Sequence, residues 1–510
     1  MTRIGTVIVG AGFAGIAAAI ALRARGVDDF VILERADAVG GTWRDNTYPG
    51  VACDVPSHLY GLASHPWPDW SRAFAPGEEI RAYLERVVRA EDLDRRLHLG
   101  TALVAARWDG GAWRIRTSRR VHNAADPSRG APEPRRVAAP ADAVTALCTD
   151  ELVADNLILA CGRLTEPRIP RIPGLQTFPG AVFHSARWRH DVDIDGARIA
   201  VAGTGASAVQ LVPELVRRGA AVTLMQRTPA WIVPRGDRVH TPEERRRWRE
   251  HPETLREVRE RLYAEGEARF ASRSGDPVAA AEARAVALAH LEAQVPDARL
   301  RSLLTPQYAF GCRRVLLSDD FYPAVSSGAV ELVPSALAAV EGSELVAADG
   351  TRREADVLVL ATGFEAARQP YARLVTGEHG LTLDEHWSGG FTAVGSTLVH
   401  GFPNLFVLNG PNASLGHNSA VLIMEAQSEF AAALIADGRP VRVTAEAEAE
   451  ATREVDALAA GTPWLTGGCR SWYVDDRSGR LTLLWPGTVA AFRERLARVR
   501  EQLIAHAITA

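Results

Sequence analysis

The sequence predicts an α/β protein with two Rossmann-like dinucleotide-binding domains. Two glycine-rich turns, at 10–15 and 203–208, each follow a short apolar strand and precede an alanine-containing helix. Each unit also has a second strand and a later apolar strand that ends in small residues, at 157–162 and 358–363. A strand, a glycine turn and a helix in this order indicate a βαβ nucleotide-binding unit far more specifically than the glycines alone.

The first unit begins with a strand at 6–9 and the turn GAGFAG. Gly10 suits a tight turn, Gly12 lets the backbone approach a pyrophosphate, and Gly15 lets the helix pack closely on the strand. The helix N-terminus then faces the phosphates with free N–H donors. The next strand, 30–33, ends at Glu34, whose carboxylate suits a ribose diol. A ribose without a 2′-phosphate, as in FAD or NAD, is therefore expected here.

The second unit repeats this pattern with a different ending. A strand at 198–202 precedes the turn, and the strand at 221–226 ends in Arg227 and Thr228. Arginine and a hydroxyl at this point favour a 2′-phosphate, and hence NADP(H) over NAD. The alternative for Arg227 is a solvated surface arginine. The residues expected to cradle this second nucleotide are Gly203, Thr204, Gly205, Ala206 and Ser207.

The order of the segments suggests that the second module is inserted into the first. We expect an FAD domain formed by 1–163 and 350–510, with an NADPH domain at 164–349 between its two parts. Residues 237–300 are dense in Arg, Glu and Ala, which predicts a helical insertion with a solvated charged face. Residues 118–140 are rich in Pro, Arg and Ala, and this composition is typical of a surface loop.

Composition excludes several other classes of protein. The chain has 510 residues, a formal charge of −4 and no lysine, so all 58 basic residues are arginine. Schiff-base lysine enzymes and P-loop enzymes are therefore excluded. The near-neutral charge gives no electrostatic footprint for nucleic acid, and the apolar run at 6–22 is too short to span a membrane.

The cysteines suggest a cellular compartment. All five stand singly, without CxxC or metal-ligand spacing, at Cys53, Cys148, Cys161, Cys312 and Cys469. This pattern predicts no structural metal, no disulfide and no dithiol redox centre, and it favours a reducing cytoplasm.

Two longer motifs flank the nucleotide-binding units. Residues 40–54, GGTWRDNTYPGVACD, fit the pattern Ala/Gly-Gly-x-Trp-x-x-x-x-Phe/Tyr-Pro-Gly/Met-x-x-x-Asp, and residues 178–188, FPGAVFHSARW, fit Phe-x-Gly-x-x-x-His-x-x-x-Trp. Further segments agree along the whole chain: QRTPAW at 226–231, GCRRVLLSDDFYP at 311–323, ATGF at 361–364, NGPNASLGHNS at 409–419 and SWY at 471–473. Together they resemble the type I Baeyer–Villiger monooxygenases, a branch of the class B flavoprotein monooxygenases.

The resemblance implies an activity and its cofactors. In this family NADPH reduces FAD, O₂ adds to the flavin at C4a, and the peroxyflavin inserts one oxygen atom next to a ketone carbonyl to give an ester or lactone. We therefore expect FAD and NADPH as cofactors and a small ketone and O₂ as substrates. We also expect a cytoplasmic monomer or weak homo-oligomer, with no nucleic-acid or membrane partner.

The resemblance also assigns roles to individual residues. Arg314 matches the arginine that stabilises the anionic oxygen species, and Asp54 matches the carboxylate that orients it; the alternative is a purely structural ion pair. Trp472 matches a mobile-loop tryptophan that reaches NADP, and its alternative is a core tryptophan. Arg313 matches a 2′-phosphate contact that is often lysine in the family. The flavin neighbours are Thr42, Trp43, Tyr60 and the backbone of Leu103.

Other readings of the same fold remain at this stage. An N- or S-oxygenating relative would use the same two cofactors, but such relatives carry Tyr or Phe where this chain has Trp188. A non-catalytic NADPH sensor would keep the fold without the chemistry. His184, at the connection between the modules, is expected to be a hinge or packing histidine and not a general base.

Overall fold

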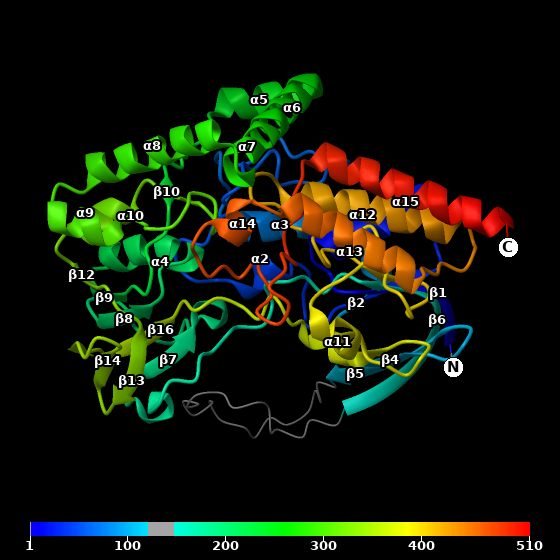
Figure 1. The fold of residues 1–510 in the computed structure, drawn as a ribbon, viewed down its shortest axis with the longest axis horizontal. Helices are drawn as coiled ribbons and strands as arrows, with labels where there is room; N and C mark the ends of the chain where they lie inside the picture. Colours follow the sequence, from blue (N-terminus) through cyan, green and yellow to red (C-terminus); the bar gives the residue numbers. More distant parts are fainter. Residues whose placement is uncertain (1, 121–146, 510) are drawn as a thin grey trace.

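The apolar segment at the start of the chain forms β1 (Thr2–Val9), a central strand of an eight-stranded sheet (Figure 1). The computed structural model describes residues 2–120 and 147–509, so the loop expected at 118–140 lies almost entirely outside the described residues. Side chains alternate along β1, with Ile8 in one core and Val7 and Val9 in the other. Both faces of the sheet are therefore buried.

The strands of this first sheet follow the order β17-β4-β5-β6-β1-β2-β3, and β18 pairs with β6. The strands β2, β1, β6 and β18 are parallel, as expected of a nucleotide-binding unit, while β4 and β5 form an antiparallel ribbon. The bounds are β2 (Phe30–Leu33), β3 (Leu97–His98), β4 (Thr101–Trp108), β5 (Trp113–Arg120), β6 (Leu147–Leu159), β17 (Val375–Thr376) and β18 (Leu405–Val407).

Helices from both ends of the chain cover one face of this sheet. The buried side chains of α1 and α12 share one core with those of α3 and α15. In Figure 1, α12, α13 and α15 lie on the right and α3 lies near the centre. Their bounds are α1 (Phe13–Ala24), α3 (Gly77–Ala90), α12 (Ala420–Ala436), α13 (Ala445–Ala459) and α15 (Val489–Thr509). The C-terminal part of the chain thus completes the fold begun by the N-terminal part.

The second sheet is parallel throughout and has the order β12-β9-β8-β16-β7. One face packs against α4 and α10, and the other against a small antiparallel sheet. The bounds are β7 (Ala181–His184), β8 (Arg198–Ala202), α4 (Ala206–Arg217), β9 (Ala221–Met225), α10 (Phe321–Ser326), β12 (Val330–Val333), β13 (Leu337–Glu341), β14 (Glu344–Ala347), β15 (Arg352–Glu354) and β16 (Val357–Leu360).

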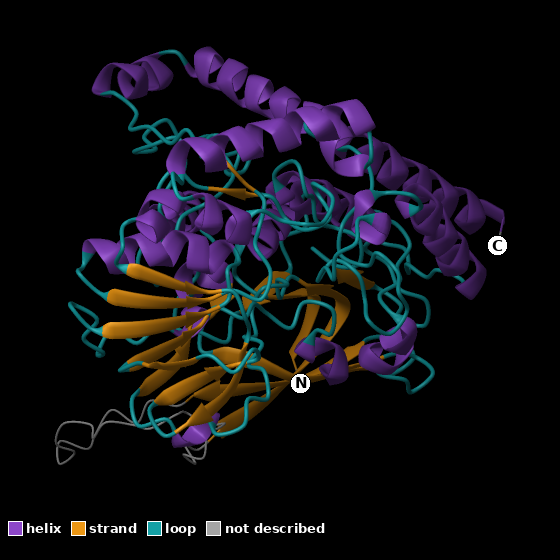
Figure 2. Cartoon of the chain, turned by 60° about the vertical axis from the view of Figure 1, so that its left-hand side comes forward, coloured by secondary structure: helices purple, strands orange, loops and turns teal. Residues whose placement is uncertain are grey.

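The position of β16 bears on the expected domain boundary. This strand hydrogen-bonds between β8 and β7, inside the second sheet. The boundary expected at residue 350 therefore precedes a strand of the second sheet. Two dinucleotide-binding sheets, each with its own helices, make the α/β fold class predicted from the sequence (Figure 2).

The segment expected to be a helical insertion is helical from residue 242 onward. Its helices are α5 (Pro242–Glu250), α6 (Pro252–Ala268), α7 (Phe270–Ser274), α8 (Pro277–Gln294) and α9 (Ala298–Leu304). In Figure 1, α5 and α6 lie at the top, α8 at the upper left and α9 below α8. Thr241 caps α5 with a capping box, and Asp276 and Asp297 cap α8 and α9. These caps explain why a stretch so rich in charge is ordered as helix.

The cysteine prediction was wrong at one pair. Cys312 and Cys469 form a disulfide with a Cα–Cα distance of 6.3 Å. The two residues lie 157 positions apart, so no local spacing in the sequence could reveal that the fold brings them together. The cysteine pattern therefore gives no argument for a reducing compartment.

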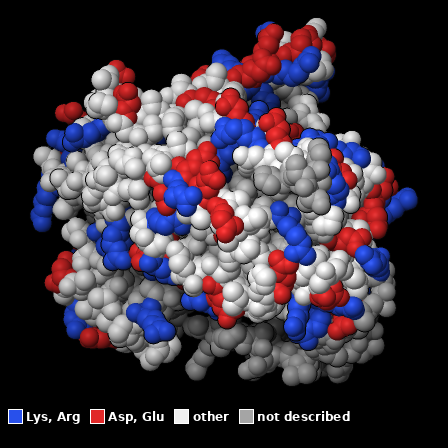
Figure 3. Space-filling model, turned by 45° about the vertical axis from the view of Figure 1, so that its right-hand side comes forward, with Lys and Arg blue, Asp and Glu red and all other residues white. Residues whose placement is uncertain are grey.

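The surface carries both signs of charge. Arginine and carboxylate side chains alternate over the face shown in Figure 3. No helix within the described residues is both long and apolar enough to cross a membrane.

Candidate active site

The first glycine turn packs so closely that side chains at two of its glycines would strike the backbone. Gly10 has a φ of +111°, and a Cβ there would lie 2.4 Å from the Ala160 carbonyl oxygen. A Cβ on Gly15 would lie 1.8 Å from the Gly10 oxygen, while Gly12 faces only the backbone of Gly41. Helix α1 begins here without a side-chain cap, so its first N–H groups are free for phosphate. This turn fits the pyrophosphate of FAD.

Glu34 stands beside this turn at the end of β2. Its buried carboxylate accepts hydrogen bonds from the N–H groups of Ala11 and Ala36, each at 2.9 Å, and pairs with Arg44 at 3.0 Å. A carboxylate offers about four acceptor positions, so one remains for a ribose hydroxyl. The contact with Arg44 was not anticipated from the sequence.

The second glycine turn is more open. Gly203 has a φ of +114°, and a Cβ on Gly205 would meet no atom within 4 Å. The Thr204 hydroxyl donates to the Thr228 carbonyl oxygen at 3.1 Å and closes the turn. Helix α4 also begins without a side-chain cap. The structure places the remaining predicted residues at the start of this helix, namely Ala206 and Ser207.

Two arginines lie near each other beside the second turn without a carboxylate to pair with. Arg227 is exposed, and Arg313 lies over the Tyr308 ring at 5.1 Å with its Nε buried and without a hydrogen bond. Burial lowers the pKa of Arg313, and the charge of Arg227 lowers it further. Within 2–120 and 147–509, no ion pair involves either residue. Two unpaired cations held together fit the 2′-phosphate of NADP.

Asp54 and Arg314 come together from opposite modules. Arg314 donates from Nε and Nη2 to one oxygen, Oδ2 of Asp54, at 2.8 and 2.5 Å. Asp54 raises the pKa of Arg314 above its ordinary value, chiefly through the attraction of its charge. The two side chains remain 33% and 23% exposed. The arginine is thus a permanently charged group held in place by one carboxylate oxygen and still accessible.

The loop that carries Asp54 is fastened to the second module. The Tyr48 hydroxyl donates to Oε1 of Gln210 on α4 at 2.8 Å, and Nε2 of Gln210 donates to the Ala52 carbonyl oxygen at 2.9 Å. Arg235 donates to the Cys53 carbonyl oxygen at 3.0 Å. These contacts hold the Asp54–Arg314 pair at the junction of the two modules.

The expected flavin neighbours lie on the first module. Thr42 and Trp43 belong to the single-turn helix α2 (Thr42–Asp45), and the Trp43 ring meets the Tyr60 ring edge-on at 5.6 Å between centroids. Burial raises the pKa of Tyr60 above its ordinary value. Leu103 lies on β4, and the first residue of this strand, Thr101, donates its N–H to the Glu34 carbonyl oxygen. Leu103 is therefore on the side where the adenosine of FAD would lie.

The loop after α14 (Pro463–Thr466) carries Trp472. This side chain is 39% exposed and packs against the Tyr473 ring, with 4.8 Å between centroids. Tyr473 is 1% exposed, and its hydroxyl lies near Arg314. Trp472 is therefore not a core tryptophan. Tyr473 was not among the site residues predicted from the sequence. The SWY triplet was the available signal, because one of two adjacent aromatic residues in a loop commonly faces inward.

His184 has a structural position. It is the last residue of β7, and its Nδ1 accepts the Ala186 N–H at 3.1 Å. Burial lowers the pKa of His184 to about 4, so the ring is neutral near neutral pH. This geometry agrees with the packing role expected for it.

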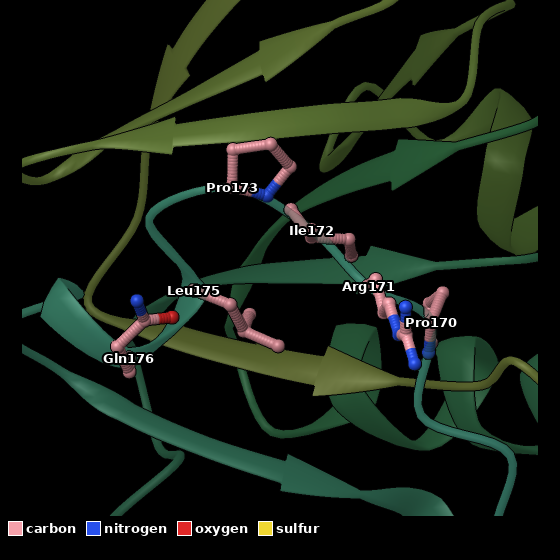
Figure 4. Close-up of a pocket in the computed structure, with 6 residues that line it drawn as sticks. All are labelled: Pro170, Arg171, Ile172, Pro173, Leu175 and Gln176. Carbon is pink, nitrogen blue, oxygen red and sulfur yellow. The ribbon is translucent and has the colours of Figure 1, made fainter.

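One surface pocket lies away from these residues. It measures about 420 Å³ and lies on the segment before β7 (Figure 4), where it is lined by Pro170, Arg171, Ile172, Pro173, Leu175 and Gln176. None of the residues predicted for either cofactor lines it.

Comparison with known proteins then decides the family. The model of an NAD(P)-binding Rossmann-like domain matches residues 8–75, and that of the flavin-binding monooxygenase-like family matches residues 143–245. A Baeyer–Villiger monooxygenase of Streptomyces coelicolor is 41% identical over 96% of this chain and 90% of its own length. The chain belongs to the Baeyer–Villiger monooxygenases. Another member, from Pseudomonas aeruginosa, is 37% identical over 95% of this chain and 88% of its own length.

Solved structures of this family share the fold. An oxidized steroid monooxygenase bound to NADP superposes with a TM-score of 0.81 at 28% identity, and a cyclohexanone monooxygenase from Rhodococcus sp. Phi1 bound to NADP⁺ with 0.82 at 27% identity. Each match covers 98% of both chains. The family resemblance and the fold class predicted from the sequence are confirmed.

Proposed function

We propose that this protein is an FAD- and NADPH-dependent monooxygenase that converts a ketone into an ester or lactone. One ketone, one O₂, one NADPH and one proton give the oxygenated product, water and NADP⁺. The observation that carries this proposal is the Asp54–Arg314 pair, held at the junction of two nucleotide-binding modules. A related FAD-binding monooxygenase of Aspergillus niger, 33% identical over 98% of this chain and 81% of its own length, also supports FAD as the cofactor.

The bound flavin supplies the activation of oxygen, and the nicotinamide supplies the electrons for it. The protein's own task is then electrostatic. Arg314 holds a fixed positive charge where negative charge develops on oxygen, and a preorganised charge of this kind counts for more at low dielectric. Asp54 fixes the guanidinium through a single carboxylate oxygen, which accepts from both Nε and Nη2.

The cofactor-binding residues follow from the two turns. We assign FAD to the turn formed by Gly10, Gly12 and Gly15, with Glu34 on the ribose. NADPH takes the second turn, with Arg227 and Arg313 on the 2′-phosphate. We also propose that the second part of the FAD domain begins after Leu360, because β16 belongs to the other sheet.

A substrate panel tests the proposed reaction. Purified FAD-loaded enzyme, NADPH and O₂ are given ketones, amines and sulfides, and mass spectrometry identifies products with one added oxygen atom. Esters or lactones from ketones support the proposal. Products from amines and sulfides alone would reassign the enzyme as an N- or S-oxygenase.

The same preparation tests the non-catalytic alternative. NADPH is mixed anaerobically with the enzyme, and loss of the flavin absorbance is followed before O₂ is admitted. Rapid bleaching excludes a sensor that only binds NADPH. A flavin spectrum unchanged by NADPH would contradict the proposed electron transfer.

A further inference from the structure

Arg273 is a buried cation without a counter-ion. It lies on α7 and is 8% exposed. Its Nη1 donates only a long bond of 3.3 Å to the Ser272 hydroxyl, and its Nε makes no hydrogen bond. The guanidinium lies over the Phe310 ring at 4.6 Å. Across the part of the chain that the structure describes, no carboxylate pairs with it. A charge buried in this way is costly unless a ligand completes its contacts.

This arginine faces the segment that carries Arg314. A Cβ on Gly311 would lie 3.4 Å from both Cα and Cδ of Arg273, so α7 packs directly on the residues before Arg314. The buried Tyr473 hydroxyl lies near both arginines, and each of them lowers its pKa against the larger effect of burial. Arg314 already has Asp54 as its ion-pair partner. Of these two arginines beside Tyr473, Arg273 is the one that lacks a partner.

The neighbouring charged groups cannot supply the missing partner. Burial lowers the pKa of Arg273 to about 10, and the charges of Arg269 and Arg314 contribute to the decrease. Glu267, at the end of α6, is engaged by the Asn418 amide at 3.0 Å and the Val489 N–H at 2.9 Å. Arg273 therefore stays protonated near neutral pH with other cations around it. Such a group is arranged to receive an anionic oxygen.

We propose that Arg273 binds an anionic group, of the carboxylate class, carried by the ketone substrate. This inference rests on the proposed oxygenation and specifies its substrate class as keto acids. A phosphate of NADP offers the same chemistry, so the test must separate the two sources. Tyr473, whose buried hydroxyl lies near both arginines, would donate to the same group.

The test compares keto acids of increasing chain length with their methyl esters. The enzymes are the wild type, Arg273→Met and Arg273→Lys, with Arg284→Met as the matched control. Arg284 also lies over an aromatic ring, that of Trp231 at 5.7 Å, but it is exposed on α8. The readouts are KM and kcat, the NADP⁺ dissociation constant, and the rise in unfolding temperature that each keto acid causes in the absence of NADPH.

We expect the wild type to prefer at least one keto acid to its ester. Arg273→Met should lower kcat/KM for the acid by about 10- to 100-fold, mainly through KM, because one charged hydrogen-bonding group is lost. The same substitution should change kcat/KM for the ester by less than about 2-fold. Arg273→Lys should recover part of the preference for the acid over the ester. The unfolding temperature of Arg273→Met should not fall, since an unpaired buried charge has been removed.

Three results would overturn the proposal. The first is a wild type that shows no preference for keto acids over their esters. The second is an Arg273→Met variant in which kcat/KM falls equally for acid and ester. The third is an Arg273→Met variant that binds NADP⁺ more weakly but keeps its preference for acids. The last would place the anion on the cofactor. If no ketone is oxygenated but a keto acid still stabilises the wild type and not Arg273→Met, anion binding by Arg273 stands and the proposed reaction fails.

Discussion

Arg314 is a cation whose orientation is set by one oxygen atom of Asp54. Both residues followed from motif positions, but the motif did not show that Nε and Nη2 share one carboxylate oxygen. Their geometry comes from long-range packing, because 260 positions separate them in the sequence. Arg273 shows the opposite case. Its charge resembled the solvated face expected of the insertion, and only the packing of α7 on Gly311 reveals its burial.

Replacing Arg314 should separate electron transfer from oxygenation. Arg314→Ala should retain part of the NADPH-driven bleaching of the flavin but lower ester formation by at least about 100-fold, the usual cost of losing one preorganised donor to a developing oxyanion. Arg314→Lys should recover little of the ester formation, because lysine lacks the planar guanidinium that donates two parallel hydrogen bonds. Arg238→Ala serves as the control, since it removes only a surface pair with Glu244. Ester formation near the wild-type rate in Arg314→Ala would remove this role from Arg314.

Replacing Arg227 should alter the choice of nicotinamide cofactor. Arg227→Ala removes one of two cations near the expected 2′-phosphate, so KM for NADPH should rise about 10-fold. KM for NADH should change little, because NADH carries no such phosphate. Steady-state kinetics with both cofactors measures the ratio. An unchanged preference would mean that Arg313 alone recognises the phosphate, or that Arg227 is an ordinary surface arginine.

At the scale of elements, the loop after α14 is tied to the segment that carries both Arg313 and Arg314. The Cys312–Cys469 disulfide joins them, and the Ala309 N–H donates to the Gly467 carbonyl oxygen at 2.9 Å. This cross-link restrains the stretch that carries Trp472. Strands and glycine turns were predictable because their signals are local, whereas this loop is held by residues from a distant part of the chain.

Breaking this disulfide should destabilise the protein. A dithiol reductant should lower the unfolding temperature of the wild type by several degrees, because a cross-link between distant residues typically contributes about 2–4 kcal/mol. The Cys312→Ser/Cys469→Ser variant should unfold near the temperature of the reduced wild type and should not respond to reductant. Calorimetry with and without reductant makes the comparison. A wild type indifferent to reductant would show that the two thiols are not joined.

At the scale of the whole molecule, the helical insertion clamps the first module to the second. The Ala73 N–H donates to the Arg238 carbonyl oxygen and the His240 N–H to the Ser71 carbonyl oxygen, each at 2.9 Å. Arg259 of α6 donates to the His58 carbonyl oxygen at 2.9 Å. The sequence predicted that this region is helical, but it could not show which module the helices touch. Helical periodicity specifies a buried face and not its partner.

This clamp should make the protein sensitive to acid. His58 of the first module stacks on His240 at 5.1 Å and meets Trp248 of α5 edge-on at 4.4 Å. Burial lowers the pKa of His58 from 6.5 to about 3, and the charge of His240 adds to this effect. Between about pH 6.5 and pH 3, the unfolded chain therefore binds a proton at His58 that the folded protein does not bind. The stabilisation is complete above about pH 6.5 and is lost progressively as the pH falls toward 3.

His58→Phe removes this titration from the interface. Phenylalanine keeps an aromatic ring at this position, in contact with His240 and Trp248, and it cannot bind a proton. The unfolding temperature of the variant should fall less steeply than that of the wild type between about pH 6.5 and pH 4, with the two curves running parallel above that range. His379→Phe, at an exposed histidine, should follow the wild-type curve. If all three proteins lose stability with the same slope, the acid sensitivity arises outside the contact between the insertion and the first module.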